Sequence, residues 1–213
     1  MPRRIIEDHQ EDFFSGLENA RKYAEEAEKS SKMRFRGFLK RLLESNVKGR
    51  YLEVGAGSGI LATMIAENDR DLSITALDIS SDMVSVAGEY IEKKGLQSQI
   101  LPITGNIEDD EFIQFQDKFD FIYSTFSLHH WKNPKTVIRN LMHLLNDGGK
   151  VMIYDLKRVW WLYWIPIENG FFKSIRAAYQ PDEIESILRE TNVTQYKIET
   201  ISPFFLQNIT LWK

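Results

Sequence analysis

The sequence predicts an α/β protein built on a doubly wound, seven-stranded sheet that is mostly parallel and has a terminal antiparallel strand. Three observations predict this fold. From residue 50 onward, short apolar strands alternate with helix-forming segments, and each strand is followed by a turn signal. Two β-rich segments then close the chain after the last helix. A single sheet with helices on both faces accommodates these elements most economically.

The expected elements follow one another in a regular order. Strands are expected at residues 50–54, 73–78, 99–104, 119–124, 149–155, 193–201 and 207–213. Helices are expected at residues 59–68, 81–94, 108–115 and 134–145, and from Pro181. Ser80 and Asn133 stand immediately before two of these helices, and their short polar side chains predict N-caps.

Residues 1–49 predict an N-terminal helical cap made of two amphipathic helices. Residues 7–28 carry eight acids and two bases, whereas residues 29–50 carry eight bases and one acid. The apolar positions of these helices are Phe13, Phe14, Leu17, Phe35, Phe38, Leu39, Leu42 and Leu43. The charges are interpreted either as solvated helix faces or as a surface that recruits a substrate.

Composition excludes several function classes. A chain of 213 residues with 43% hydrophobic content is expected to form a single domain over residues 1–213. A net charge of −4 gives no general attraction to nucleic acid or anionic membranes. The sequence contains no cysteine, which excludes disulfides, thiolate zinc sites and cysteine nucleophiles, and no metal site is predicted.

Hydrophobic segments give the expected location. The N-terminus lacks the apolar stretch of a signal peptide. The longest aromatic-rich apolar run, residues 159–167, falls well short of the roughly 20 residues of a membrane-spanning helix. A cytoplasmic protein without stable membrane insertion is therefore expected.

The strongest local signal is the segment YLEVGAGSGIL, in which a strand runs into Gly55, Gly57 and Gly59 and then into a helix. Glycine permits a tight turn and the close approach of a ligand. The spacing is GxGxG rather than the GxGxxG of dinucleotide enzymes, and the acid Glu53 precedes it. A pyrophosphate is bound by bare backbone N–H groups, whereas a cationic amino-acid ligand tolerates a nearby carboxylate. The glycines alone predict a nucleotide-like ligand, or only a tight turn.

Residues 50–155 resemble the class I S-adenosylmethionine-dependent methyltransferases, which have a Rossmann-like fold. EVGAGSG resembles the first motif of that family. The resemblance implies that Glu53 lies near the ammonium group of the cofactor and that Gly55, Ala56 and Gly57 pass beneath its methionine part. Gly59 is assigned to the same cofactor-binding loop.

The next two motifs follow in the family's order. In ALDIS, Asp78 matches the acid that binds both ribose hydroxyls, because a carboxylate accepts two hydrogen bonds at once. A helix N-cap is the alternative role for Asp78. The resemblance places Ile79 and Met83 against the adenine. In GNIED, Asn106 replaces the usual acid as acceptor from the adenine amino group, and Ile107 follows as a backbone donor.

The segment FDFIYSTFSLHHW resembles the fourth strand of the family and the loop after it. The resemblance places Ser124 near the methionine moiety. His129 and His130 are the candidates for a catalytic base, and lining the site without chemistry is the alternative. Asp155 ends the fifth expected strand, either to bind the acceptor or to pair with Lys157 or Arg158.

The resemblance implies a methyltransferase that binds S-adenosylmethionine, releases S-adenosylhomocysteine and acts by in-line methyl transfer. A small-molecule acceptor is expected, and an RNA or protein acceptor stays open because of the basic stretch at 29–50. A nicotinamide-dependent oxidoreductase and a non-catalytic binding module are the rival functions. The oligomeric state is not predicted.

The resemblance also divides the chain into four parts. They are an N-terminal helical extension (1–49), a cofactor-binding core (50–155), an acceptor-side insertion (156–180) and a terminal helix with a strand pair (181–213). The insertion contains Trp160, Trp161, Tyr163 and Trp164. These aromatic residues are interpreted as an acceptor pocket or lid, as core packing, or as an interfacial surface.

Overall fold

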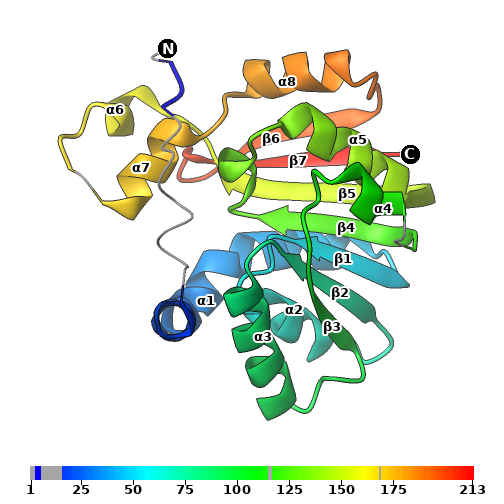
Figure 1. Ribbon diagram of the computed structural model, residues 1–213. Helices are drawn as coiled ribbons and strands as arrows, with labels where there is room; N and C mark the ends of the chain where they lie inside the picture. The colour runs from blue at the N-terminus through cyan, green and yellow to red at the C-terminus, as the bar shows by residue number, and fades with distance from the viewer. Residues whose placement is uncertain (1–2, 6–15, 115–116, 168) are drawn as a thin grey trace.

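The computed structural model describes residues 3–5, 16–114, 117–167 and 169–213, which contain a seven-stranded sheet with helices packed against it (Figure 1). The strand order is β3-β2-β1-β4-β5-β7-β6. Strands β1 to β5 pair in parallel, whereas β7 is antiparallel to both β5 and β6. The predicted α/β fold, mostly parallel with terminal antiparallel strands, is confirmed.

The strands lie close to their predicted positions. They are β1 (Arg50–Val54), β2 (Ser73–Asp78), β3 (Ile100–Thr104), β4 (Phe119–Thr125), β5 (Leu145–Leu156), β6 (Tyr196–Ile201) and β7 (Leu206–Trp212). The largest difference is at β5, which begins at Leu145 and not at Gly149. Leu145 pairs with Phe119 across an irregularity in the β4–β5 register, so the strand extends back through Gly148 and Gly149.

After residue 50 the helices follow the predicted order, except that the two helices within residues 160–177 were not predicted. They are α1 (Leu17–Ser45), α2 (Ile60–Ala66), α3 (Ser81–Lys93), α4 (Asp110–Gln114), α5 (Pro134–Leu144), α6 (Trp160–Tyr163), α7 (Gly170–Ala177) and α8 (Pro181–Glu190), with a 3₁₀ turn η2 (Leu128–His130). The two predicted N-caps are confirmed. The Ser80 side chain accepts a hydrogen bond from the Met83 N–H, and the Asn133 side chain accepts one from the Thr136 N–H.

The N-terminal cap is one helix where two were expected. Helix α1 runs without interruption from Leu17 to Ser45 and buries a single stripe of residues at helical spacing. Its acidic first half and basic second half suit the helix dipole, so the change of charge does not mark a break. Leu43, expected on the apolar face, is exposed. Phe13 and Phe14 lie outside the described residues.

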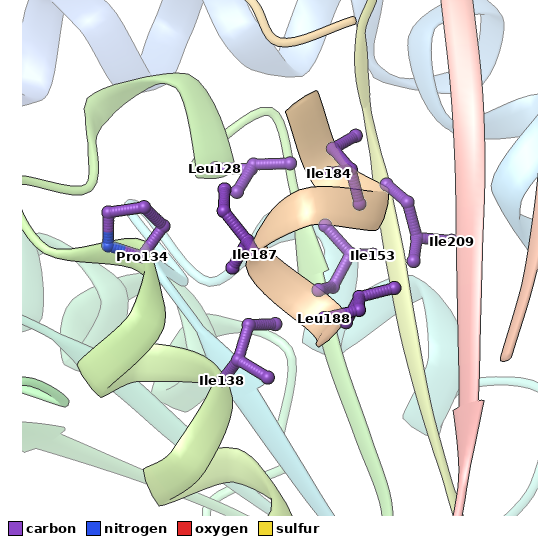
Figure 2. A pocket seen from close by; sticks show the side chains of 8 residues that line it. All are labelled: Leu128, Pro134, Ile138, Ile153, Ile184, Ile187, Leu188 and Ile209. Carbon is purple, nitrogen blue, oxygen red and sulfur yellow. The ribbon is translucent and has the colours of Figure 1, made fainter. Parts of the chain in front are cut away.

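The central strands are buried on both faces because helices cover each side of the sheet. In β4, Phe121 and Tyr123 belong to the cluster under α1, α2 and α3, whereas Ile122 belongs to the cluster under α5 and α8. This alternation follows from the strand pleat. Figure 2 shows eight apolar side chains that converge between α5, β5, α8 and β7. They surround a void of about 10 Å³, which is core packing and has no polar group to bind a ligand.

Helices α6 and α7 form a lobe between β5 and α8 that projects beyond one end of the strands, at the left of Figure 1. The lobe has a small core of its own, to which Val159, Leu162 and Ile175 contribute. Within the described part of the chain, no helix is both long and apolar enough to cross a membrane.

Candidate functional site

A cavity of about 750 Å³ opens at the carboxyl ends of the parallel strands. It lies beside β1 and β4, which are neighbours in the sheet. From this pair, β2 and β3 extend the sheet in one direction and β5 extends it in the other. Loops leave this switch point in opposite directions and create a crevice, which is where open α/β sheets bind ligands. Strands β1, β2 and β4, the loop after β3, and helices α1 and α7 all contribute to the wall.

The glycine loop after β1 is tied to the end of β2. The N–H groups of Gly55 and Ala56 both donate to the Leu77 carbonyl, at 2.9 and 3.0 Å. The Gly57 N–H donates to Asp78 Oδ2 at 2.7 Å. These three consecutive donors are therefore already engaged by the protein. These three positions therefore do not present the bare N–H groups that a pyrophosphate requires.

Asp78 stands at the last position of β2 and lines the cavity. Its Oδ2 accepts from the Gly57 N–H, and its Oδ1 accepts from the Ser80 N–H at 3.0 Å. Burial raises the pKa of this carboxyl, while the hydrogen bonds oppose that rise. Since an ionised carboxylate offers about four lone-pair sites, acceptor capacity remains for a ligand.

Glu53 is the second carboxyl group in the cavity wall, and only 2% of it is exposed. The Tyr123 hydroxyl donates to Glu53 Oε2 at 3.2 Å. Burial raises the pKa of Glu53 to about 8. A cation placed beside this group favours its ionised form, so the site is suited to a ligand ammonium.

The residues assigned to the adenine also lie on the cavity wall. Ile79 is exposed there, whereas Met83 and Ile107 line the wall with little exposed area. Asn106 is exposed, and its Oδ1 accepts from the Glu108 N–H at 2.9 Å. That bond uses one of the two lone pairs of the amide oxygen, so Asn106 retains a single acceptor position.

The structure does not place Gly59 or Ser124 among the cavity-lining residues. The Ser124 side chain is buried and donates to the Val54 carbonyl at 2.8 Å, which joins β4 to β1. Its neighbours Thr125 and Ser127 line the cavity instead. A Cβ at Gly59 would lie 3.1 Å from the Ala87 Cβ, so this glycine allows α2 and α3 to approach. Both residues therefore contribute to packing next to the cavity and not to its wall.

The two histidines line the cavity from η2, but their surroundings differ. His129 Nδ1 lies 2.7 Å from Asp155 Oδ1, and the His129 N–H donates to Asp155 Oδ2 at 3.0 Å. Both members of this pair are buried. The centroids of the His130 and His129 rings lie 3.9 Å apart, and the His130 side chain is open to the cavity. The surrounding protein and His129 lower the pKa of His130.

A model of a methyltransferase domain matches residues 23–196 of this chain. The match covers far more than half of the chain, from α1 to the start of β6. The chain belongs to the methyltransferase domain family. The predicted resemblance is thereby confirmed.

Relatives within the methyltransferase family share moderate identity. An uncharacterized methyltransferase from Staphylococcus carnosus is 38% identical over 115 residues, which is 53% of this chain and 50% of that protein. The ubiquinone/menaquinone biosynthesis C-methyltransferase UbiE of Rhizobium meliloti is 26% identical over 156 residues, which is 73% of this chain and 58% of that protein. The chain therefore spans between half and three fifths of the length of these two relatives.

A solved structure agrees with the fold. The SAM-dependent methyltransferase from Aquifex aeolicus superposes with a TM-score of 0.72 at 17% identity, over 92% of this chain and 97% of that one. At this identity the likeness is one of architecture, and it includes the Rossmann-like sheet.

Sequence reasoning missed one wall of the cavity in this methyltransferase domain. Helix α1 contributes Tyr23, Ala27, Arg34 and Phe35, and α7 contributes Lys173 and Ala177. The helical stripe on α1 indicated a buried face but not what that face covers. The guanidinium of Arg34 lies 4.7 Å from the centre of the Phe126 ring, which joins α1 to the end of β4. The exposed Trp160, Trp161 and Trp164 do not line the cavity.

Proposed function

We propose that the chain is a methyltransferase that uses S-adenosylmethionine and transfers its methyl group to a small-molecule acceptor. One observation carries the proposal: Asp78 and Glu53 stand on adjacent strands in the wall of one large cavity, beside a glycine loop whose N–H groups at Gly55, Ala56 and Gly57 bond within the protein. Membership of the methyltransferase family and the names of its relatives support this assignment.

The residues present fit the cofactor by their chemistry. Glu53 suits the ammonium group, Asp78 suits the ribose hydroxyls, and the apolar surfaces of Ile79 and Met83 suit the adenine. When bound, S-adenosylmethionine supplies an already activated methyl group. The protein then has to hold the acceptor in line with that group and exclude water.

A nicotinamide-dependent oxidoreductase fits less well. Its pyrophosphate needs free N–H donors at the glycine loop, and Gly55, Ala56 and Gly57 direct theirs to Leu77 and Asp78.

Asp78→Ala tests the cofactor site. We expect the affinity for S-adenosylmethionine, measured by calorimetry, to fall by at least about a hundredfold because hydrogen bonds to a charged acceptor are lost. The control is Asp71→Ala, which removes an exposed acid just before the opposite end of the same strand. Equal affinity in the two variants would contradict the ribose assignment.

For acceptors that must lose a proton, we propose that His129 is the base and that Asp155 is its positioning residue. Asp155 accepts from the His129 backbone and lies beside its Nδ1, so the ring is held in one orientation. The Nε2 atom is then the one left for the substrate proton. His130 has no carboxylate partner within hydrogen-bond reach among the described residues, and its lowered pKa makes it a weak base.

The proton transfer is tested after a screen with labelled cofactor has identified an acceptor. Metabolite, RNA and protein fractions form the arms of that screen, because the exposed cations of α1, such as Lys29 and Arg36, leave an RNA or protein acceptor open.

Asp155→Asn is expected to lower kcat by about ten- to a hundredfold and to shift the pH profile of kcat, with cofactor affinity retained. His130→Ala is the control, expected to keep that pH profile. An unchanged profile in Asp155→Asn would remove the pair from the mechanism.

A further inference from the structure

Six large apolar side chains are exposed at the end of the molecule where the α6–α7 lobe projects (Figure 1). Each is between 42% and 70% exposed: Trp160, Trp161, Trp164, Ile167, Phe171 and Phe204. Five belong to the lobe and the sixth to the turn between β6 and β7. We call these six residues the lobe surface. An exposed apolar group of this kind marks an interaction site in a soluble domain.

The lobe surface is continuous across two segments that are distant in sequence. The centroid of the Phe205 ring lies 6.5 Å from that of Trp161 and 5.6 Å from that of Phe171, so the β6–β7 turn and the lobe are in contact there. The Lys157 N–H donates to the Phe205 carbonyl at 2.7 Å, which fixes the turn beside the start of the lobe.

The outward direction of the tryptophans is built into the lobe. On a helix, positions 160, 161 and 164 fall within one arc, and position 162 falls on the opposite side. Leu162 is the buried member and anchors α6 to the core of the lobe. Arg176 then donates to the carbonyls of Tyr163 and Ile165, at 3.3 and 2.7 Å, and so holds the segment that follows. The tryptophans are therefore exposed on a segment that packing and hydrogen bonds hold in place.

The charge of the lobe differs from that of the whole chain. Apart from Arg158, which is buried and paired with Glu183, residues 156–180 carry three cations (Lys157, Lys173 and Arg176) and one acid, although the net charge of the chain is −4. Lys157 donates to the neutral Thr200 hydroxyl, so this bond leaves its charge uncompensated. The exposed Arg3 is joined to the lobe because its carbonyl accepts from the Tyr163 hydroxyl at 3.1 Å.

We propose that the lobe surface docks reversibly onto a lipid bilayer that contains anionic headgroups. Tryptophan prefers the membrane–water interface because its ring is apolar and its N–H still finds a polar partner. The surrounding cations are attracted to anionic lipids. A second copy of this chain is a poorer occupant, because a symmetric contact brings the same cations face to face.

Docking would place the bilayer next to the cavity, since Lys173 and Ala177 of α7 line it. The proposal does not depend on methyl transfer. Its test needs neither cofactor nor acceptor, so a failure of one proposal is distinguishable from a failure of the other.

The test is co-sedimentation of the full chain with two kinds of vesicle, phosphatidylcholine mixed with phosphatidylglycerol and phosphatidylcholine alone. We expect binding to the anionic vesicles that weakens in high salt, and little binding to the neutral ones. The double variant Trp160→Gln with Trp164→Gln is expected to lose at least about tenfold in partitioning. Leu43→Gln with Leu101→Gln, at two other exposed apolar positions, is the matched control and is expected to bind like the wild type.

Circular dichroism and thermal melting of the variants establish that they are folded. The proposal is overturned if the wild type binds neither vesicle, if it binds both equally, or if the tryptophan variant binds as the wild type does. A dimer that the tryptophan substitutions dissolve, with no vesicle binding, would also overturn it and assign the surface to a second copy.

Discussion

Glu53 is expected to affect both the stability of the protein without ligand and the proposed binding of the cofactor. In a carboxyl group that is 2% exposed, the ionised form lacks hydration, and hydrogen bonds from the Tyr123 hydroxyl and the Ala62 backbone compensate for only part of that cost. An ammonium group beside it would remove the penalty. The residue is therefore expected to destabilise the empty protein at alkaline pH and to strengthen cofactor binding there.

The pH dependence of Glu53→Gln tests this role. Because the folded state raises the pKa of Glu53 from 4.5 to about 8, its contribution to stability is complete below pH 4.5 and is lost as the pH rises through 8. The melting temperature of the variant relative to the wild type should therefore rise between pH 5 and pH 8. We expect a gain on the order of 1–3 kcal/mol at the alkaline end.

Cofactor affinity supplies the second measurement on this variant. The affinity of the wild type is expected to increase from pH 6 to pH 8, as Glu53 ionises more readily beside the ammonium group. The variant has no such group to ionise, so its affinity should be weaker and nearly independent of pH. A variant with the pH dependence of the wild type would separate Glu53 from the cofactor.

Helix α1 shows at the scale of one element how packing overrides local preference. Gly37 lies in the middle of this helix, where glycine costs about 1 kcal/mol relative to alanine. A Cβ at this position would lie 2.5 Å from the Tyr154 hydroxyl oxygen. The Tyr154 ring is buried between Phe38 and Phe126 and has little room to move.

Gly37→Ala is therefore expected to destabilise the protein by about 1–3 kcal/mol in urea denaturation, despite the better helix former. Gly88→Ala in α3 is the matched control, because nothing lies within 4 Å of its Cβ position. The control should gain up to about 1 kcal/mol. If both variants were stabilised, the contact between α1 and Tyr154 would be looser than the structure indicates.

At the scale of the whole molecule, the cavity joins elements from distant parts of the chain. Its wall includes Tyr23 near the start of α1, Asp78 at the end of β2 and Ala177 at the end of α7. A ligand that contacts such a wall binds the folded state and not the unfolded chain. Its binding therefore stabilises the whole domain, by an amount that depends on the ligand concentration relative to Kd.

A thermal-shift experiment measures this linkage. S-adenosylhomocysteine at about 100 times its Kd adds about 2.7 kcal/mol, which raises the melting temperature of a domain of this size by about 5–10 °C. NAD at the same concentration should give no shift. A shift with NAD alone would favour the oxidoreductase that the hydrogen bonds of the glycine loop argue against.

Local chemistry determined the order of the elements and predicted the cavity residues that we propose for the cofactor. Alternating short strands and helices, the turn at Gly55 and Gly57, and the N-cap at Ser80 depend on residues close together in sequence. Asp78 was assigned from its place at the end of a strand, and parallel pairing brings such ends to one edge of the sheet.

Contacts between distant residues were decided only by the tertiary structure. Asp155 was left between two roles because its partner, His129, lies on a neighbouring strand connection 26 residues away, and the β4–β5 register sets their distance. Trp160, Trp161 and Trp164 had three interpretations from sequence, and only the burial of Leu162 showed which side of the segment faces outward. Periodicity gives the spacing of a face, but what lies opposite that face depends on how the whole chain packs.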